Sequence, residues 1–236
     1  MVLMSFTFIP FNFLSSLIDR ALCICTAIGL AACIMPIACS AFSGIMTSTE
    51  VTKTGTLEIS LVEASVLISK VPVFVTSVLV IMPENAEQAI DIIQAARPMA
   101  VQIHNNLSPS ELKKIKGMNV KLIKTIPVPQ NAENETLMTQ IRELDGIADA
   151  VLLDTSLGGK AGGTGATHNW DISSRVVLDA GIPVILAGGL NPENVSYAVK
   201  SVRPYAVDTA SGVETCGRKD EKKVIDFIKN ARSYGI

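Results

Sequence analysis

Residues 148–187 carry the pattern that decides the fold, ADAVLLDTSLGGKAGGTGATHNWDISSRVVLDAGIPVILA. The apolar run from Ala148 to Asp154 predicts a buried strand, and a glycine-rich loop follows it. Asp171 to Ala180 then predicts a helix, and Pro183 to Ala187 a second strand. A strand, a helix and a strand in this order predict one parallel βαβ unit.

The same alternation continues on both sides of this unit, from about residue 60 onward. We expect further strands over Val73–Val80, Met99–His104, Asn119–Thr125 and Tyr205–Asp208. We expect further helices over Ser60–Lys70, Glu84–Ala96, Ser108–Gly117, Glu135–Leu144, Asn191–Val202 and Lys219–Arg232. If Leu22–Cys25 and Phe42–Met46 supply two more strands, the parallel sheet can close, and the predicted fold class is an α/β protein, a (β/α)₈ TIM barrel.

The first part of the chain differs in composition from the rest. Its first 49 residues hold only Asp19 and Arg20 of the 42 charged residues. The uncharged stretch 21–49 is long enough for a membrane span of about 20 residues. Pro36 and small polar residues interrupt it, and a barrel needs a first βαβ unit, so we favour the barrel over a membrane anchor. We therefore expect an extension over 1–20 and a single barrel domain over 21–236.

Composition narrows the classes of partner. The 236 residues suit one barrel of roughly 250 residues. A net charge of -2 gives no electrostatic reason to expect nucleic acid or an anionic membrane surface as partner. Five cysteines, an odd number gathered toward one end, fit a reducing cytoplasm better than a disulfide framework. No cysteine or histidine set has zinc-ligand spacing, so we predict no metal.

Catalytic side chains of such barrels lie at the carboxyl ends of the strands. Cys25, Gln102, His104 and Asp154 end predicted strands here. Asp154 follows three apolar residues, and partial burial favours the protonated carboxyl group that a general acid needs. The alternatives are that Asp154 caps the following loop and that Cys25 is a small buried hydrophobe.

Three predicted loops bring small residues to the same rim. Their candidate phosphate-binding residues are Gly163, Gly165, Gly188, Gly189, Ser211 and Gly212. Glycine lets backbone N–H groups approach a phosphate, and the loops after the last two strands often form a phosphate site in these barrels. A single glycine pair is equally typical of a turn.

Several motifs together resemble those of the phosphoribosylanthranilate isomerase family. They are VQIH at 101–104, LLDT at 152–155, GGTG at 162–165, AGGLNPENV at 187–195 and SGVE at 211–214. Their order and spacing match that family too. The resemblance is dense from about Val71 to the C-terminus and thins out toward the N-terminus.

The resemblance implies a cytoplasmic enzyme of tryptophan biosynthesis that performs an Amadori rearrangement on a small-molecule substrate without a cofactor. It implies Asp154 as the general acid, Cys25 as the base, and substrate contacts from Gln102 and His104. It also admits association with other enzymes of the tryptophan pathway.

The sequence departs from the family pattern before residue 60. Cys23 and Thr26 stand where the family's Lys-Ile-Cys-Gly motif has lysine and glycine, and Thr56 or Leu57 stands where it has an arginine. The alternative function is therefore a catalytically impaired paralogue that binds a sugar phosphate or a partner enzyme. Ribulose-phosphate epimerase fits less well, because its metal ligands are not found at these strand ends.

Overall fold

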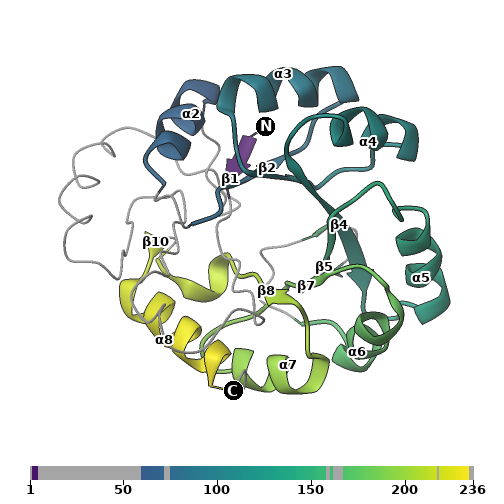
Figure 1. The fold of residues 1–236 in the computed structure, drawn as a ribbon. Helices are drawn as coiled ribbons and strands as arrows, with labels where there is room; N and C mark the ends of the chain where they lie inside the picture. The colour runs from purple at the N-terminus through teal and green to yellow at the C-terminus, as the bar shows by residue number, and fades with distance from the viewer. Residues whose placement is uncertain are drawn as a thin grey trace, which may run out of the picture.

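The computed structural model describes residues 2–4, 60–71, 75–157, 160–161, 167–216 and 218–233. Cys25, Gly163 and Gly165 lie outside these ranges, as do the strands expected at Leu22–Cys25 and Phe42–Met46. In the described part, the strands lie toward the centre of a ring and the helices lie around them (Figure 1).

The described strands form one main sheet and a small hairpin. The main sheet contains β1 (Val2–Met4), β2 (Val78–Ile81), β3 (Ala100–Ile103), β4 (Lys121–Pro129), β5 (Ala150–Leu157), β6 (Lys160–Ala161), β7 (Val184–Leu186) and β8 (Ala206–Val207). The hairpin pairs β9 (Glu214–Thr215) with β10 (Arg218–Lys219). Strands β2, β3, β4, β5, β7 and β8 are parallel neighbours in chain order. This arrangement confirms a TIM-like α/β fold.

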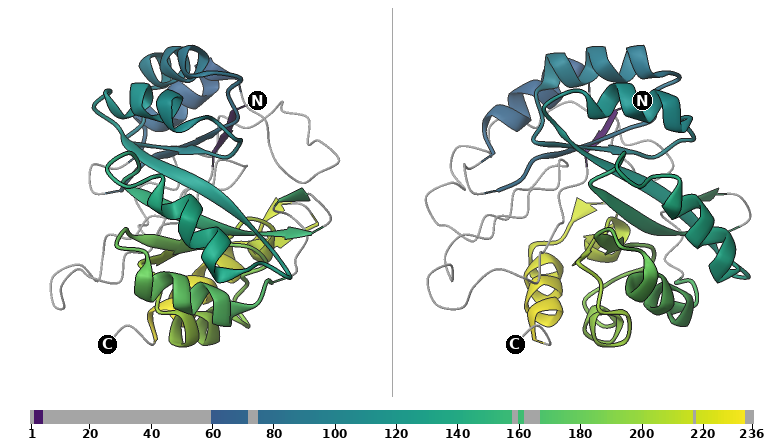
Figure 2. Two further views of the ribbon diagram at one scale, coloured as in Figure 1. Left: turned by 90° about the vertical axis from the view of Figure 1, so that its right-hand side faces the viewer. Right: turned by 45° about the vertical axis from the view of Figure 1, so that its right-hand side comes forward.

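The helices alternate with these strands and pack on the outer side of the curved sheet (Figure 2). They are α2 (Leu61–Ser69), α3 (Ala86–Ala96), α4 (Pro109–Lys116), α5 (Asn134–Arg142), α6 (Trp170–Asp179), α7 (Val195–Val202) and α8 (Glu221–Arg232), with the 3₁₀ turn η1 at Ser211–Val213. Ser108 caps α4 through the capping box with Glu111 that its spacing predicts. Ser60 caps α2 in the same way, with Glu63.

Alternation along β5 decides which side chains face the inside of the curve. Val151 and Leu153 belong to the core cluster shared with the helices, whereas Ala150 and Leu152 pack with inward residues of the neighbouring strands. Successive side chains of a strand point to opposite faces. Asp154 is therefore in phase with Ala150 and Leu152 and faces the inside.

Several element boundaries differ from the prediction: β2 covers Val78–Ile81 where Val73–Val80 was expected, and β5 continues past Asp154 to Leu157. Three further differences have a local reason. Strand β4 was expected to end at Thr125 but continues through Pro127 and Pro129, since proline fixes a φ that an extended chain accepts. Helix α7 begins at Val195 and not at Asn191, because the side chain of Asn191 accepts bonds from the next N–H groups and holds a turn there. Asp220 caps α8, so Lys219 lies before the helix.

Strand β1 comes from the region expected to be an extension. It pairs antiparallel with β2, with Val2 opposite Ile81, on the edge of β2 away from β3. Among the described residues no pairing joins β8 to β1 or β2. The closure expected of a complete barrel is thus not part of the described sheet.

Candidate active site

Two of the predicted site residues meet at the carboxyl edge of the sheet. His104 follows β3, and its backbone N–H donates to the carbonyl of Ile81 at 3.1 Å. Its Nε2 lies 3.6 Å from Oδ2 of Asp154, whose side chain is 9% exposed. A buried carboxyl group beside an imidazole is an arrangement suited to proton transfer. The geometry therefore brings together a candidate acid and a candidate substrate contact.

Gln102 lies two residues earlier on β3 and is also buried. Its amide nitrogen donates to Oγ1 of Thr125 at 2.9 Å. Its Oε1 has no hydrogen-bond partner among the described residues. A buried acceptor without a partner is costly, so this oxygen is placed to accept a bond from a ligand. Thr125 orients the amide, a role that the sequence pattern did not predict.

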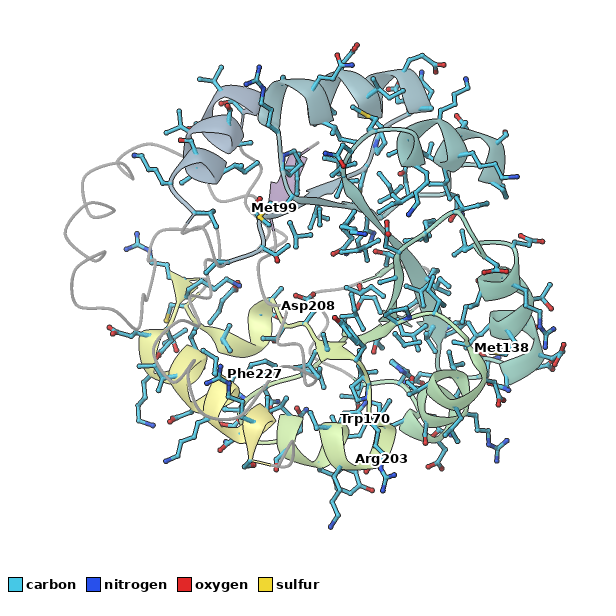
Figure 3. All side chains as sticks on the ribbon, viewed as in Figure 1. Met99, Met138, Trp170, Arg203, Asp208 and Phe227 are labelled. Carbon is cyan, nitrogen blue, oxygen red and sulfur yellow. The ribbon has the colours of Figure 1, made fainter. Side chains whose placement is uncertain are left out.

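Asp208 occupies the corresponding place after β8. The backbone N–H of Asp208 donates to the carbonyl of Leu186 at 2.9 Å, and Asp208 is buried. Figure 3 shows Asp208 on the inner side of the ring, whereas Arg203 lies at its outer side. The ends of β3, β5 and β8 thus all present polar side chains to the inside.

The candidate phosphate loops after β7 and β8 are in direct contact. Thr209 donates from Oγ1 to the carbonyl of Leu190 at 2.6 Å. A Cβ on Gly212 would lie 1.8 Å from that same carbonyl oxygen, a distance that excludes any side chain there. Gly188 and Gly189, in the turn just before Leu190, both have positive φ. Two of the three glycine loops that the sequence pattern grouped, those with Gly188, Gly189, Ser211 and Gly212, are therefore in contact, whereas Gly163 and Gly165 lie outside the described residues.

A buried polar cluster beside Asp154 was not predicted. His168 Nδ1 lies 2.8 Å from Thr155 Oγ1, and His168 Nε2 lies 2.6 Å from Ser173 Oγ. The Thr155–His168 contact joins the two ends of the segment that contains the GGTG motif. A Cβ on Gly188 would lie 2.1 Å from Thr155 Oγ1, so the cluster also abuts the loop after β7. The available signal was His168, the histidine three residues after the GGTG motif at 162–165.

Burial lowers the pKa of His168 to about 4, although the negative charge of Asp154 opposes part of this shift. The unfolded chain, with a histidine pKa near 6.5, therefore binds more protons between about pH 4 and 6.5. The free energy of unfolding should rise with pH across this window, by up to about 3 kcal/mol, and level off above it.

Urea denaturation of the wild type and of His168→Phe at several pH values measures this contribution. The difference in free energy of unfolding between the wild type and His168→Phe should depend on pH only from about pH 4 to pH 6.5. Burial lowers the pKa of Lys124 to about 8, so the titration of Lys124 affects the free energy of unfolding only at higher pH. Parallel pH profiles for the two proteins would contradict a neutral, buried His168.

Two further observations concern the described residues only. The described residues contain no group of three or more histidine, cysteine or acidic side chains that could hold a metal ion. Within the same part of the chain, every helix is too short or too polar to cross a bilayer. The uncharged stretch 21–49 lies outside the described ranges.

The geometry defines a parallel α/β protein of the TIM-like class, with buried polar groups and glycine loops at the carboxyl edge of its sheet. The chain belongs to the family of N-(5′-phosphoribosyl)anthranilate (PRA) isomerase, whose model matches residues 32–230. Cys25 precedes the matched range.

Individual relatives agree with this assignment. The N-(5′-phosphoribosyl)anthranilate isomerase of Methanosarcina acetivorans is 49% identical over 179 residues, which cover 72% of this chain and 75% of the relative. The structure of the isomerase from Pyrococcus furiosus has a TM-score of 0.62 at 32% identity and covers 74% of this chain and 82% of its own. A further isomerase was solved in complex with reduced 1-(o-carboxyphenylamino)-1-deoxyribulose 5-phosphate, with a TM-score of 0.59, 31% identity, and coverage of 74% of this chain and 80% of its own.

Proposed function

We propose that this chain is an isomerase that converts phosphoribosylanthranilate to 1-(o-carboxyphenylamino)-1-deoxyribulose 5-phosphate in tryptophan biosynthesis. The observation that carries the proposal is the contact between the buried Asp154 and the partly buried His104, 3.6 Å apart, at the rim where the glycine loops lie. Family membership gives the substrate class. The reaction is intramolecular and needs no cofactor.

In the proposed mechanism, Asp154 donates a proton to the ring oxygen of the furanose, and the C1–O bond breaks to give a Schiff base. A base then removes the proton from sugar C2, the electron pair of that C–H bond forms the C1=C2 double bond, and the π pair of the Schiff base returns to the nitrogen to give an enolamine. The enolamine becomes the ketone by proton transfer. Asp154 is placed for the first step because its carboxyl group is buried at the rim, next to the imidazole proposed to contact the substrate.

Substrate positioning is assigned to the remaining rim residues. Gln102 Oε1, buried and without a partner among the described residues, would accept a bond from a substrate donor. His104 would bond the substrate next to the acid. The 5′-phosphate would be held by backbone N–H groups at Gly163, Gly165, Gly188, Gly189, Ser211 and Gly212, which lets a protein of net charge -2 bind an anion without a basic patch.

We assign the base to Cys25 and the closing strands to the region before residue 60. A closed (β/α)₈ sheet over 21–236, with 1–20 as an extension, would require Leu22–Cys25 and Phe42–Met46 to lie between β8 and β2. In that arrangement a parallel strand would pair with β2 along the edge that β1 occupies in this structure. Cys25 would then enter the rim beside Asp154.

Replacing Cys25 with alanine should lower turnover by about a thousandfold, because no other group would remove the C2 proton. Cys23→Ala is the matched control: on the expected strand Cys23 shares the face of Cys25 but lies two residues farther from the carboxyl end, where catalytic side chains gather. It should change turnover by less than about threefold. Steady-state kinetics of both purified variants test the assignment, and equal effects would remove Cys25 from the base role.

The second candidate function is a catalytically impaired barrel that binds a sugar phosphate. Thr26, and Thr56 or Leu57 at the position of the family arginine, favour it, because neither threonine nor leucine can form the bidentate pair that arginine makes with a carboxylate. Complementation of a tryptophan auxotroph that lacks this isomerase tests both functions. Growth with the wild type and not with Asp154→Asn supports the isomerase, and no growth with either supports the impaired barrel.

Cytoplasmic location and association with other tryptophan-pathway enzymes remain predictions.

A further inference from the structure

Lys219 has a buried ammonium group close to the proposed phosphate loop. Its Nζ lies 2.6 Å from Oε1 of Glu214, and the two side chains are only 6% and 10% exposed. The same Nζ donates to the backbone carbonyl of Ala210 at 2.7 Å. A buried ion pair is often no more stabilising than apolar side chains of the same volume. The bond to Ala210 therefore suggests a role in orienting the backbone.

The orientation matters because of the geometry of the peptide that joins Ala210 to Ser211. In a trans peptide the carbonyl and the N–H point in opposite directions, and the described chain has no cis peptide. Holding the Ala210 carbonyl toward Lys219 thus directs the Ser211 N–H away from it. Ala210, with φ -112° and ψ -84°, lies outside the helical and extended ranges, so regular secondary structure does not set this peptide.

The other end of the same turn is held in a similar way. Lys223 donates from Nζ to the backbone carbonyl of Glu214 at 2.6 Å. Two lysines thus bond the carbonyls that flank η1 (Ser211–Val213). Gly212, within that turn, abuts the carbonyl of Leu190. The backbone between the two bonded carbonyls is fixed from both ends and from the side.

We propose that Lys219 is a positioning residue for the 5′-phosphate: it holds the Ala210 carbonyl and thereby directs the Ser211 N–H into the anion site. This inference rests on the proposed function, which assigns the phosphate to this rim. Lys219 does not itself contact the phosphate. Its charge is neutralised by Glu214, and its effect passes through one peptide plane.

The test measures binding of reduced 1-(o-carboxyphenylamino)-1-deoxyribulose 5-phosphate by isothermal titration, and kinetics in parallel. Lys219→Met should weaken binding of this analogue and raise KM by about tenfold, the loss expected for one hydrogen bond, while kcat changes by less than about threefold. The phosphate does not react, so its loss affects binding alone. Lys222→Met is the matched control, because Lys222 makes an equally short bond to Asp226 but is 85% exposed. It should bind like the wild type.

A second pair of variants separates positioning from stability. Lys219→Met leaves the buried Glu214 unpaired, which destabilises the fold. The double variant Lys219→Met/Glu214→Gln removes that unpaired charge and should still bind the analogue about tenfold more weakly than the wild type. Glu214→Gln alone keeps the bond to Ala210 and should lose less affinity than either. Wild-type affinity in a folded double variant would overturn the proposal, as would a Glu214→Gln loss equal to that of Lys219→Met.

Failure of the phosphate site itself gives a different result. If the wild type binds the dephosphorylated analogue as tightly as the phosphorylated one, the proposed phosphate site is wrong, and the inference about Lys219 is overturned with it. If the wild type prefers the phosphorylated analogue and Lys219→Met keeps that preference in full, only the role of Lys219 is overturned.

Discussion

Asp154→Asn should lower turnover by several orders of magnitude and leave the fold intact. The amide has the shape of the carboxyl group, but it cannot donate a proton to the ring oxygen of the substrate. General acid catalysis contributes roughly 10²–10⁴-fold to a rate, which sets the expected loss. The measurement is kcat for the purified variant, with circular dichroism to show that the fold is retained.

His104→Gln is the informative companion to this variant. It removes the imidazole 3.6 Å from Asp154 and keeps a donor of similar reach. Because His104 is proposed to bind substrate rather than to transfer the proton, its KM should rise more than its kcat falls. For the first variant, near-native turnover of Asp154→Asn would contradict the assignment of Asp154 as the general acid.

Gly212→Ala should weaken the binding of phosphorylated ligands by about a hundredfold, the loss of two hydrogen bonds to a charged group. The alanine Cβ would lie 1.8 Å from the Leu190 carbonyl oxygen, so the two glycine loops must separate. Since the clash involves backbone, no side-chain rotation relieves it. Isothermal titration with the phosphorylated analogue measures the effect.

Gly117→Ala is the matched control for this substitution. Gly117 has φ -64° at the end of α4, and its Cβ would approach a backbone oxygen only to 3.3 Å. It should bind the analogue like the wild type. If Gly212→Ala is folded and binds equally well, the phosphate lies elsewhere.

Sequence patterns predicted the parts of this protein that depend on local regularity. The six parallel strands followed from apolar runs, and the inward Asp154 follows from the alternation of side chains along β5, although β5 continues three residues beyond it. The contact between the loops after β7 and β8, where Gly212 abuts Leu190, followed from the general rule that the carboxyl ends of parallel strands share one edge.

The remaining features depend on contacts between residues far apart in the chain or on competing local preferences. The bond between Thr155 and His168 joins residues on either side of a loop, and no local pattern indicates it. Lys219 has the polarity of a helix start, yet Asp220 takes the capping position and leaves Lys219 in β10. The strand was expected to end at Thr125, but β4 continues through Pro127, which pairs with Asp154.

The most direct measurement of the central claim is the consumption of phosphoribosylanthranilate by the purified full chain, with Asp154→Asn prepared in parallel. We predict turnover by the wild type, formation of 1-(o-carboxyphenylamino)-1-deoxyribulose 5-phosphate as product, and a loss of at least about a hundredfold in the variant. A folded wild-type chain that binds the reduced product analogue but forms no product would contradict the claim that it is an isomerase.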